Sequence, residues 1–336
     1  MLNFLLRRTL RVILILVSVE LLVFLLVHAI PGSPWDSPTN QARALGSIFV
    51  DPITLERRSQ YFGFDLPLWR QFTRYLIGDI RAEDGFVCGV ICGNLGPSAR
   101  QIGRSVQDVL FQPAEGRGAW ESRAGYTFRL VIYAFGIVAG LGVPLGVISA
   151  LRAKSRFDRV ISATLTSLAS IPVFVLGLLG IFVFASGLKW IKVLPDWSEP
   201  RYWILPTVLL AVVPLTNMMK ITRASILHAL GDEYIRTARA KGLTRSQTIW
   251  KHVLPNGLIS ILTYLLPIFV ELLAASFIIE GIFGFPGFGR EYWDSIGDLD
   301  YAMIMGITLI YAFSISVVNL LLELVERAID PRLRLS

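Results

Sequence analysis

The chain has 336 residues, a formal net charge of +7, and 54% hydrophobic residues against 17% charged ones. A hydrophobic fraction this high excludes an ordinary soluble domain and predicts a membrane protein whose core is made by helices packing in lipid. The excess of Lys and Arg does not require a nucleic-acid partner, because basic residues in short loops are usual determinants of membrane topology.

The first predicted element is an apolar run over about residues 12–30, which Arg7, Arg8 and Arg11 precede. The run is long for a signal peptide and no small-x-small cleavage site follows it, so residues 1–30 are predicted to hold a cytoplasmic tail and an uncleaved span. Glu20 lies in this span. A carboxylate in lipid is costly, so we expect Glu20 to face protein or water and favour a hydrogen bond to a neighbouring helix without a chemical role.

Residues 31–125 are polar, rich in Gly, Pro, Arg and Asp, and contain no apolar run able to cross a bilayer. They are predicted to form an extracytoplasmic domain, either a cap that receives a binding protein or a structural spacer. Cys88 and Cys92 are the only cysteines, and a disulfide or two unpaired thiols both fit their spacing. No histidine lies near them, so a zinc site is not expected.

Five further apolar runs bring the predicted number of transmembrane helices to six. Basic residues follow the second, fourth and last runs, whereas Asp294, Asp298 and Asp300 place the loop after the fifth run outside. Both termini are therefore expected in the cytoplasm, with residues 126–326 as the core and residues 327–336 as a tail. The five predicted helices cover about residues 126–151, 160–188, 204–219, 258–281 and 303–324.

Small residues and prolines mark the second and third of these spans. The pairs Gly136/Gly140 and Gly142/Gly146 are each spaced four apart, which permits close approach of another helix. Pro172 predicts a kink in the third span.

A polar, basic segment over residues 232–256, DEYIRTARAKGLTRSQTIWKHVLPN, lies between the fourth and fifth spans. Its spacing predicts two short helices separated at Gly242, with Thr244 as the N-cap of the second helix and Gln247 completing a capping box. Pro255 is expected to mark a change of direction into the fifth span.

The fifth span ends in EGIFGFPGFGR, which begins at Glu280. So much Gly and Pro at membrane depth predicts a break or re-entrant turn lined by protein or water. Glu280 could face a substrate path, but we favour a role in holding the outer turn by accepting bonds from amides around the glycines. For Glu271, earlier in the span, path lining and helix packing both stay open.

These segments together resemble the permease subunits of bacterial ABC importers, in particular the dipeptide/oligopeptide/nickel branch. The family's docking loop reads Glu-Ala-Ala, three residues, Gly, nine residues, Ile-x-Leu-Pro, and here YIRTARAKGL is followed by KHVLPN. The spacing of Ala, Gly and Leu-Pro matches, whereas Arg236, Thr237 and His252 depart from the pattern. LERRSQYFGFDLPLWRQFTRYLIGDI and NLGPSARQIGRSVQDVL are also similar to the family, but residues 81–93 have no recognised counterpart.

The resemblance implies an all-α polytopic membrane protein of the type I importer permease class, with six transmembrane helices and a large extracytoplasmic insert between the first two. It implies an inner-membrane location and four kinds of partner: the lipid bilayer, a sibling permease, two ATPase subunits and an extracytoplasmic substrate-binding protein. The chain contains no G-x-x-x-x-G-K-[ST] phosphate loop. No cofactor is therefore expected in this chain, and ATP and Mg are expected in the ATPase subunits.

The resemblance assigns roles to two sets of residues, one for ATPase docking and one for the outer gate. In the docking set, Tyr234 and Ala238 are expected to pack on an ATPase subunit, and Arg236 and Arg239 are expected to supply charge contacts. The residues assigned to ATPase docking are Glu233, Tyr234, Arg236, Thr237, Ala238, Arg239, Lys241, Gly242, Leu254 and Pro255. The residues assigned to the outer gate are Glu280, Phe283, Pro286, Gly287 and Gly289.

Peptides are the expected cargo, with nickel or oligosaccharides as alternatives within the same architecture. An intramembrane enzyme built on residues such as His28, Glu20, Glu271 and Glu280 is disfavoured because no G-x-S-x-G or H-E-x-x-H motif is present, and no catalytic or metal-binding residue is expected. A stand-alone carrier is disfavoured because it would not require a docking loop of this form.

Overall fold

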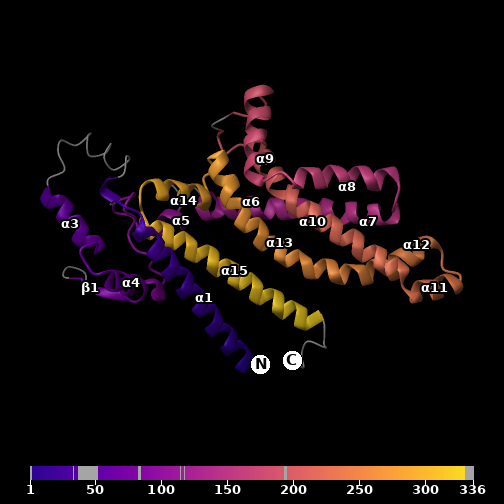
Figure 1. Cartoon of the computed structure of the whole chain (residues 1–336), viewed down its shortest axis with the longest axis horizontal. Coiled ribbons are helices and arrows are strands. Elements are labelled where there is room, and N and C mark those ends of the chain that lie inside the picture. Colours follow the sequence, from indigo (N-terminus) through magenta and orange to yellow (C-terminus); the bar gives the residue numbers. More distant parts are fainter. Residues whose placement is uncertain are drawn as a thin grey trace. The chain divides into compact units, whose positions relative to one another are not determined.

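The computed structural model describes helices joined by short connections (Figure 1). Five described helices are long and apolar enough to cross a membrane, and a bent pair of helices brings the number to six if it counts as one span. The predicted polytopic, predominantly helical membrane fold is confirmed. The residues that the structure describes are 2–32, 34–36, 52–81, 85–113, 115–116, 118–192 and 195–329.

The chain divides into two compact units, one formed by Met1–Tyr126 with Pro286–Ser314 and the other by Thr127–Phe285 with Ile315–Ser336. Residues 286–314, which the sequence places in the core of the permease, therefore cluster with the N-terminal part of the chain. The boundaries of the compact units differ from the predicted division into residues 31–125 and 126–326.

The first unit combines one long N-terminal helix with small elements of the insert and a C-terminal helix pair. Its helices are α1 (Leu2–Ala29), α3 (Pro52–Phe62), α4 (Leu68–Leu76), α5 (Val106–Phe111), α14 (Phe288–Gly297) and the first part of α15 (Tyr301–Ile329). Short 3-10 turns cover Pro34–Asp36, Val90–Cys92 and Ala119–Glu121. Strands β1 (Gly78–Arg81) and β2 (Gly85–Cys88) pair antiparallel, which the helical prediction did not include.

The core of the first unit joins α1 and α5 to the start of α15. Val27 of α1 packs with Tyr301 and Ile304 of α15. Gly306 of α15 lets α5 approach closely, because a Cβ there would lie 2.7 Å from a methyl carbon of Val106. The start of α15 thus belongs to this unit through direct packing.

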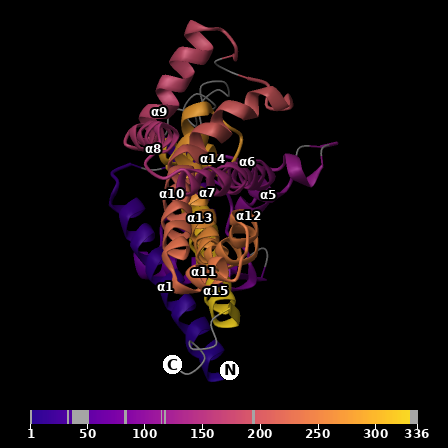
Figure 2. The same ribbon diagram turned by 90° about the vertical axis from the view of Figure 1, so that its right-hand side faces the viewer.

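The second unit is a bundle built around one long helix, α10. Its elements in chain order are α6 (Arg123–Ile137), a π turn (Val138–Gly142), α7 (Val143–Leu151), α8 (Arg156–Ala169), α9 (Val173–Gly180), a π turn (Ile181–Gly187), a 3-10 turn (Pro200–Trp203), α10 (Ile204–Gly231), α11 (Glu233–Ala240), α12 (Arg245–Thr248), a π turn (Ile249–Val253) and α13 (Leu254–Phe283). Helices α7, α10 and α13 lie side by side in both views (Figure 1, Figure 2).

One glycine pair explains how closely α7 and α10 approach. A Cβ at Gly146 would lie 2.5 Å from the Cβ of Thr222, and one at Gly142 would lie 3.1 Å from the Cβ of Met218. The predicted packing role is therefore confirmed for Gly142 and Gly146. A Cβ at Gly136 or Gly140 would meet no described atom within 4 Å, so that pair does not serve packing within the described part of this chain.

The third predicted span is not a kinked helix but two helices, α8 and α9, that meet at 95°. Pro172 lies directly before α9, with φ −53° and ψ 139°. A proline disfavours helical geometry in the residue before it and cannot donate a backbone hydrogen bond, so the helix ends and restarts. The fourth span differs too, because α10 continues past Lys220 and Arg223 to Gly231.

Candidate functional site

The predicted docking segment is attached to the bundle through one side of α11. Ile235 is 1% exposed and packs in a cluster with Ala150 of α7, Ile226 and Ala229 of α10, and Val253. A movement of α11 would therefore act directly on α7 and α10, because a close-packed cluster transmits displacement.

The end of α11 is formed by a Schellman motif at Gly242. The Gly242 N–H donates to the Arg239 carbonyl at 3.0 Å, and the Leu243 N–H donates to the Ala238 carbonyl at 3.3 Å. Gly242 has a φ of +84°, and a Cβ there would meet no atom within 4 Å. Glycine is therefore required at this position because of its backbone conformation and not because a neighbouring atom would clash with a side chain. The predicted break at Gly242 is confirmed.

The helix after this turn begins with the predicted capping box. The Thr244 hydroxyl accepts from the Gln247 N–H at 3.3 Å, and the Gln247 side-chain oxygen accepts from the Thr244 N–H at 3.0 Å. Helical geometry then runs without interruption to Phe283. Pro255 lies in the first turn of α13 after a π turn, so the chain stays helical there, and the expected change of direction stays a prediction.

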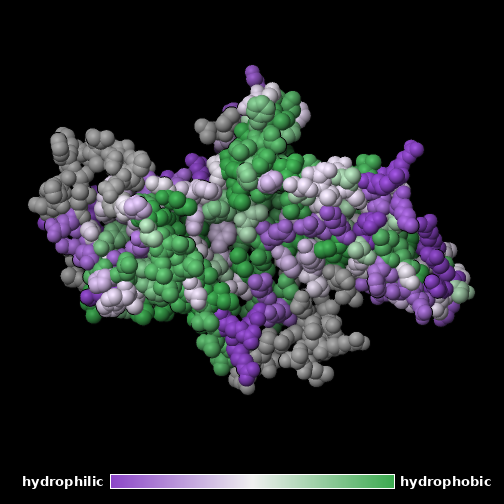
Figure 3. Space-filling model, in the orientation of Figure 1, coloured by the Kyte–Doolittle hydropathy of each residue, from purple (hydrophilic) through white to green (hydrophobic). Residues whose placement is uncertain are grey.

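The outward side of the docking segment carries charge. Tyr234, Arg236, Arg239 and Lys241 are exposed, and in the described part of the chain these three basic side chains form no ion pair. The surface over α11 and α12 is hydrophilic, whereas the surface over α9 is apolar (Figure 3). The segment thus presents a basic face to a partner.

Ala238 does not belong to this outward face. It is 7% exposed and lies on the inner side of α11 with Ile235. The expected contact of Ala238 with an ATPase subunit is therefore corrected: its small side chain allows α11 to lie close to its own bundle. A hollow of about 510 Å³ lies beside the segment, and Arg239, Leu243 and Arg245 are among its lining residues.

An ion pair between a buried carboxylate and a partly exposed arginine connects α8 with α10 in the same unit. Arg223 donates from Nε to Asp158 Oδ1 at 2.8 Å and from Nη2 to Oδ2 at 2.9 Å. The Ser149 hydroxyl of α7 and the Lys154 N–H also bond to Asp158. The bidentate pair, together with the Ser149 hydroxyl, joins the three helices α7, α8 and α10 next to the docking segment. Arg223 was interpreted from the sequence only as a topology marker, so this ion pair was missed.

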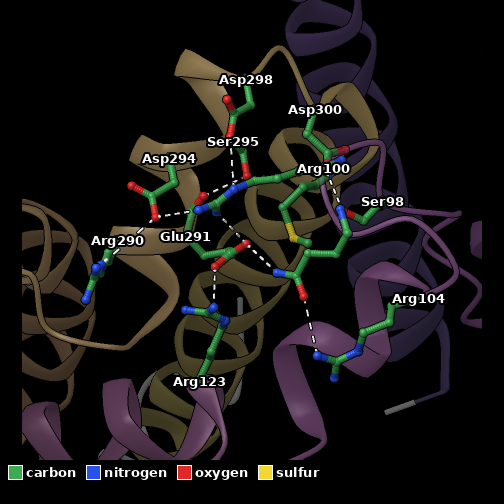
Figure 4. A network of polar contacts seen from close by, with 12 residues as sticks. Ser98, Arg100, Arg104, Arg123, Arg290, Glu291, Asp294, Ser295, Asp298 and Asp300 are labelled. Carbon is green, nitrogen blue, oxygen red and sulfur yellow. Dashed lines mark hydrogen bonds and ion pairs between the residues drawn. The ribbon is translucent and has the colours of Figure 1, made fainter. Parts of the chain in front are cut away.

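A second polar site lies in the first unit, where Arg100 of the insert meets α14 (Figure 4). Arg100 contacts Glu291 at 3.1 Å, Asp294 at 3.1 Å and Asp298 at 2.9 Å. Arg123 contacts the other oxygen of Glu291 at 2.7 Å. We call these five residues with Ser98 and Asp300 the ion cluster.

Asp300 extends the ion cluster to the start of α15. Its Oδ2 accepts from the Ser98 hydroxyl at 2.5 Å and from the Arg100 N–H at 3.1 Å. Burial raises the pKa of Asp300, and the hydrogen bonds from Ser98 and from backbone amides oppose that shift.

The ion cluster changes the interpretation of the acidic residues after the fifth span. Glu291 and Asp300 are fully buried and Asp298 is 5% exposed, so this stretch is not simply an acidic, solvated loop. Arg100 and Glu291 were not singled out in the sequence, because nothing local relates residues so far apart in the chain. A carboxylate-rich stretch after the fifth span and an insert rich in arginine were the available signals.

The predicted outer gate begins with another Schellman motif. The Gly284 N–H donates to the Gly281 carbonyl at 3.3 Å, the Phe285 N–H donates to the Glu280 carbonyl at 2.9 Å, and Gly284 has a φ of +59°. Phe285 is fully buried against Trp197 and Trp203. The predicted break is therefore the end of α13.

The residues assigned to the outer gate fall on both sides of this break. Glu280 is fully buried and Phe283 is 6% exposed at the end of α13. Pro286 follows the cap, Gly287 is the N-cap of the short helix α14, and Gly289 is buried in it. The role of Glu280 in holding the turn stays a prediction, as does the role of Glu271, which is half-buried in α13.

The remaining candidate residues show no arrangement for metal chemistry. Among the described residues, no group of three or more His, Cys, Asp or Glu side chains is placed to hold a metal ion.

His28 bonds to the Phe24 carbonyl at 2.8 Å and to the Gln71 side-chain oxygen at 3.0 Å. Cys88 and Cys92 form a disulfide, which decides between the two alternatives that their spacing left open.

The fold is that of a multi-pass membrane protein, and comparisons with known proteins give its family. Residues 142–335 match the model described as "Binding-protein-dependent transport system inner membrane component", and residues 1–109 match the model of its N-terminal part. The chain belongs to this family and is a permease subunit of an ABC importer.

Two relatives cover nearly the whole chain. The dipeptide transport system permease protein DppB of Bacillus subtilis is 34% identical over 316 residues, which are 94% of this chain and 92% of that protein. The glutathione transport system permease protein GsiC of Escherichia coli is 32% identical over 334 residues, 99% of each chain. A crystal structure of an amino acid ABC transporter with histidines covers 62% of this chain and 93% of its own, with 22% identity and a TM-score of 0.49.

Proposed function

We propose that this chain forms, together with a sibling permease, the translocation path of an importer for di- or oligopeptides. An extracytoplasmic binding protein delivers the cargo, and two ATPase subunits, which bind ATP and Mg, dock on residues 232–256. The names of the relatives support the choice of cargo, since dipeptides and glutathione both contain peptide bonds. Both termini lie in the cytoplasm in this arrangement, as the basic loops predict.

The observation that carries the proposal is the two-sided construction of α11. Its inner side, through Ile235, shares a hydrophobic cluster with α7 and α10, and its outer side presents basic residues that form no ion pair within the described part of the chain. Such an element can bind a partner and transmit the partner's movement. ATP-driven closure of the ATPase subunits would then shift the bundle between two states.

Charge reversal tests the docking role. We expect the double variant R236E/R239E, in the full complex, to lose most co-purifying ATPase and the coupling of ATP hydrolysis to transport in proteoliposomes. K192E is the matched control, because Lys192 is also exposed but lies in the connection between α9 and α10. Full co-purification and coupling in R236E/R239E would exclude docking through this face.

A separate experiment tests the cargo. We expect di- or oligopeptides, presented with the cognate binding protein, to stimulate ATP hydrolysis by the reconstituted complex. Stimulation by nickel or by oligosaccharides instead of peptides would overturn the choice of cargo while leaving the importer mechanism in place.

A further inference from the structure

The insert contains a compact piece that lies against the membrane-spanning helix α1. This piece, here called the α4–hairpin unit, comprises α4, the strands β1 and β2, and the 3-10 turn Val90–Cys92. The Gly89 N–H donates to the Ile77 carbonyl at 3.0 Å and thereby ties the end of the hairpin to the end of α4. The disulfide between Cys88 and Cys92 closes the turn that follows.

Three pairs of side chains fix the position of α4 along α1. Gln71 bonds to His28, one residue from the end of α1, at 3.0 Å. The Phe72 ring packs at a tilt against the Phe24 ring, with ring centroids 5.2 Å apart.

The third pair lies deepest along α1. Tyr75 lies near Glu20, whose side chain is 1% exposed, and neither the Tyr75 hydroxyl nor the Glu20 carboxylate has a hydrogen-bond partner among the described residues. Helix α4 therefore runs antiparallel to α1 and follows it inward from its C-terminal end. The expectation that Glu20 faces protein is confirmed.

These pairs place the end of α4 well within the bilayer. Glu20 precedes Ala29 by a distance of about 14 Å along the helix axis, at 1.5 Å rise per residue. The hydrocarbon core of a bilayer is about 30 Å thick. An element that contacts α1 from His28 to Glu20 therefore lies at the depth of one leaflet, the external one in the proposed topology.

The side of the α4–hairpin unit that faces away from α1 is apolar. Ile80 and Phe86 are a directly opposed cross-strand pair and are 77% and 62% exposed. Ile77 is 54% exposed and Ile91 is 74% exposed, on the two segments that flank the hairpin. In water, such a group of large apolar side chains would be unfavourable.

Three polar or amphipathic side chains of the unit, Trp69, Arg70 and Asp79, are placed in agreement with this depth, and Arg74 donates to the Tyr61 carbonyl at 2.9 Å. Trp69 and Arg70 are exposed at the start of α4, level with the end of α1, where aromatic and basic residues favour the membrane interface. Asp79 neighbours Ile80 in β1, but it lines a cavity of about 110 Å³ together with Val87, on the opposite face of the hairpin. The outward face of the hairpin therefore carries the apolar side chains of Ile80 and Phe86.

We propose that the α4–hairpin unit is embedded in the leaflet at the C-terminal end of α1, with Ile77, Ile80, Phe86 and Ile91 against lipid acyl chains. The occupant is lipid because the contacts with α1 place the patch at the depth of one leaflet, where α1 itself also exposes large apolar side chains such as Leu22 and Leu26, each 59% exposed. This part of the insert is a membrane anchor for the remainder of the insert, and it is independent of which cargo the importer carries.

Quenching by brominated lipid tests this proposal in the full complex reconstituted in nanodiscs. A bimane label is attached at I80C, and in a second variant at F86C; both positions are exposed, and the native cysteines are bonded to each other. We expect bimane fluorescence to fall to less than half in nanodiscs of acyl-chain-brominated lipid. The matched control is I102C, an exposed isoleucine in a turn of the insert outside the α4–hairpin unit, where little quenching is expected.

Two other results would overturn the proposal. Quenching of the labels at I80C and F86C by aqueous iodide but not by brominated lipid would show a solvent-exposed face, open to a binding protein. Protection from both quenchers would show that the sibling permease covers the patch.

Discussion

The docking segment and the ion cluster each gather several charged side chains, and they use them in opposite ways. Arg236, Arg239 and Lys241 are exposed and form no ion pair with the part of the chain that the structure describes. Arg100, in contrast, contacts three carboxylates, and Glu291 is shared with a second arginine. Paired charges with little exposure hold a fixed arrangement, whereas exposed, unpaired charges are available to a partner.

This comparison predicts that the ion cluster affects stability and the docking face affects coupling. Residues of the ion cluster join the insert to α14 within the first unit. Residues of the docking segment combine an inner anchor with an outer binding face. The following variants separate these roles.

The largest effect is expected from R100A. The change leaves Asp298 without the arginine that contacts it and leaves Glu291 with Arg123 alone, and breaking a buried pair from one side typically costs about 3–5 kcal/mol. Thermal unfolding of the purified complex would show a strongly lowered Tm. R104A is the control, because Arg104 is exposed and only donates hydrogen bonds to Gln101 and the Asp108 carbonyl. Equal Tm values for the two variants would contradict a stabilising role of the ion cluster.

The next largest effect is expected from I235A, which removes the inner anchor of α11. Truncating a buried isoleucine to alanine typically costs about 2–5 kcal/mol, so we expect faster amide hydrogen exchange in residues 233–240 and weaker coupling. Y234A, which changes a side chain that is 37% exposed, should weaken ATPase binding with little change in exchange. If both variants changed exchange equally, the two sides of α11 would not have separate roles.

A smaller effect is expected from G242A. A side chain at a φ of +84° costs about 1–2 kcal/mol, because a left-handed conformation brings Cβ close to the following carbonyl oxygen. Coupled transport should fall, and G242N should retain more activity because asparagine tolerates this region better. G231A is the control, at an open position without positive φ. Transport by G242A at the level of G231A would argue against the Schellman turn as a requirement.

The smallest effect concerns pH and Asp300. Its folded-state pKa is raised above the ordinary value of 3.8, so its contribution to stability is most favourable below pH 3.8 and declines as pH rises through the folded-state pKa. D300N removes this titration. The Tm of the wild type relative to D300N should therefore decrease as pH rises over that window, and a difference that is constant with pH would contradict the prediction.

Much of the helical fold and part of the docking segment could be predicted because their causes are local. A continuous apolar run predicts a span wherever it occurs, and the turn at Gly242 and the capping box of Thr244 and Gln247 depend on residues only a few positions apart. Pro172 predicted only a kink, whereas the structure ends one helix and begins another there with a bend of 95°, which depends on how α8 and α9 pack.

Only the tertiary structure decided which distant groups meet. The sequence does not show that Arg100 contacts Glu291, that Ala238 faces its own bundle, or that α4 of a polar insert lies along α1. The physical reason is that hydrogen bonds within a turn are set by a few backbone angles, whereas ion pairs and burial depend on which surfaces the whole chain brings together. The sequence by itself therefore determined the membrane spans and the local turns, and the packing of the chain determined which charges are paired within it and which remain for a partner.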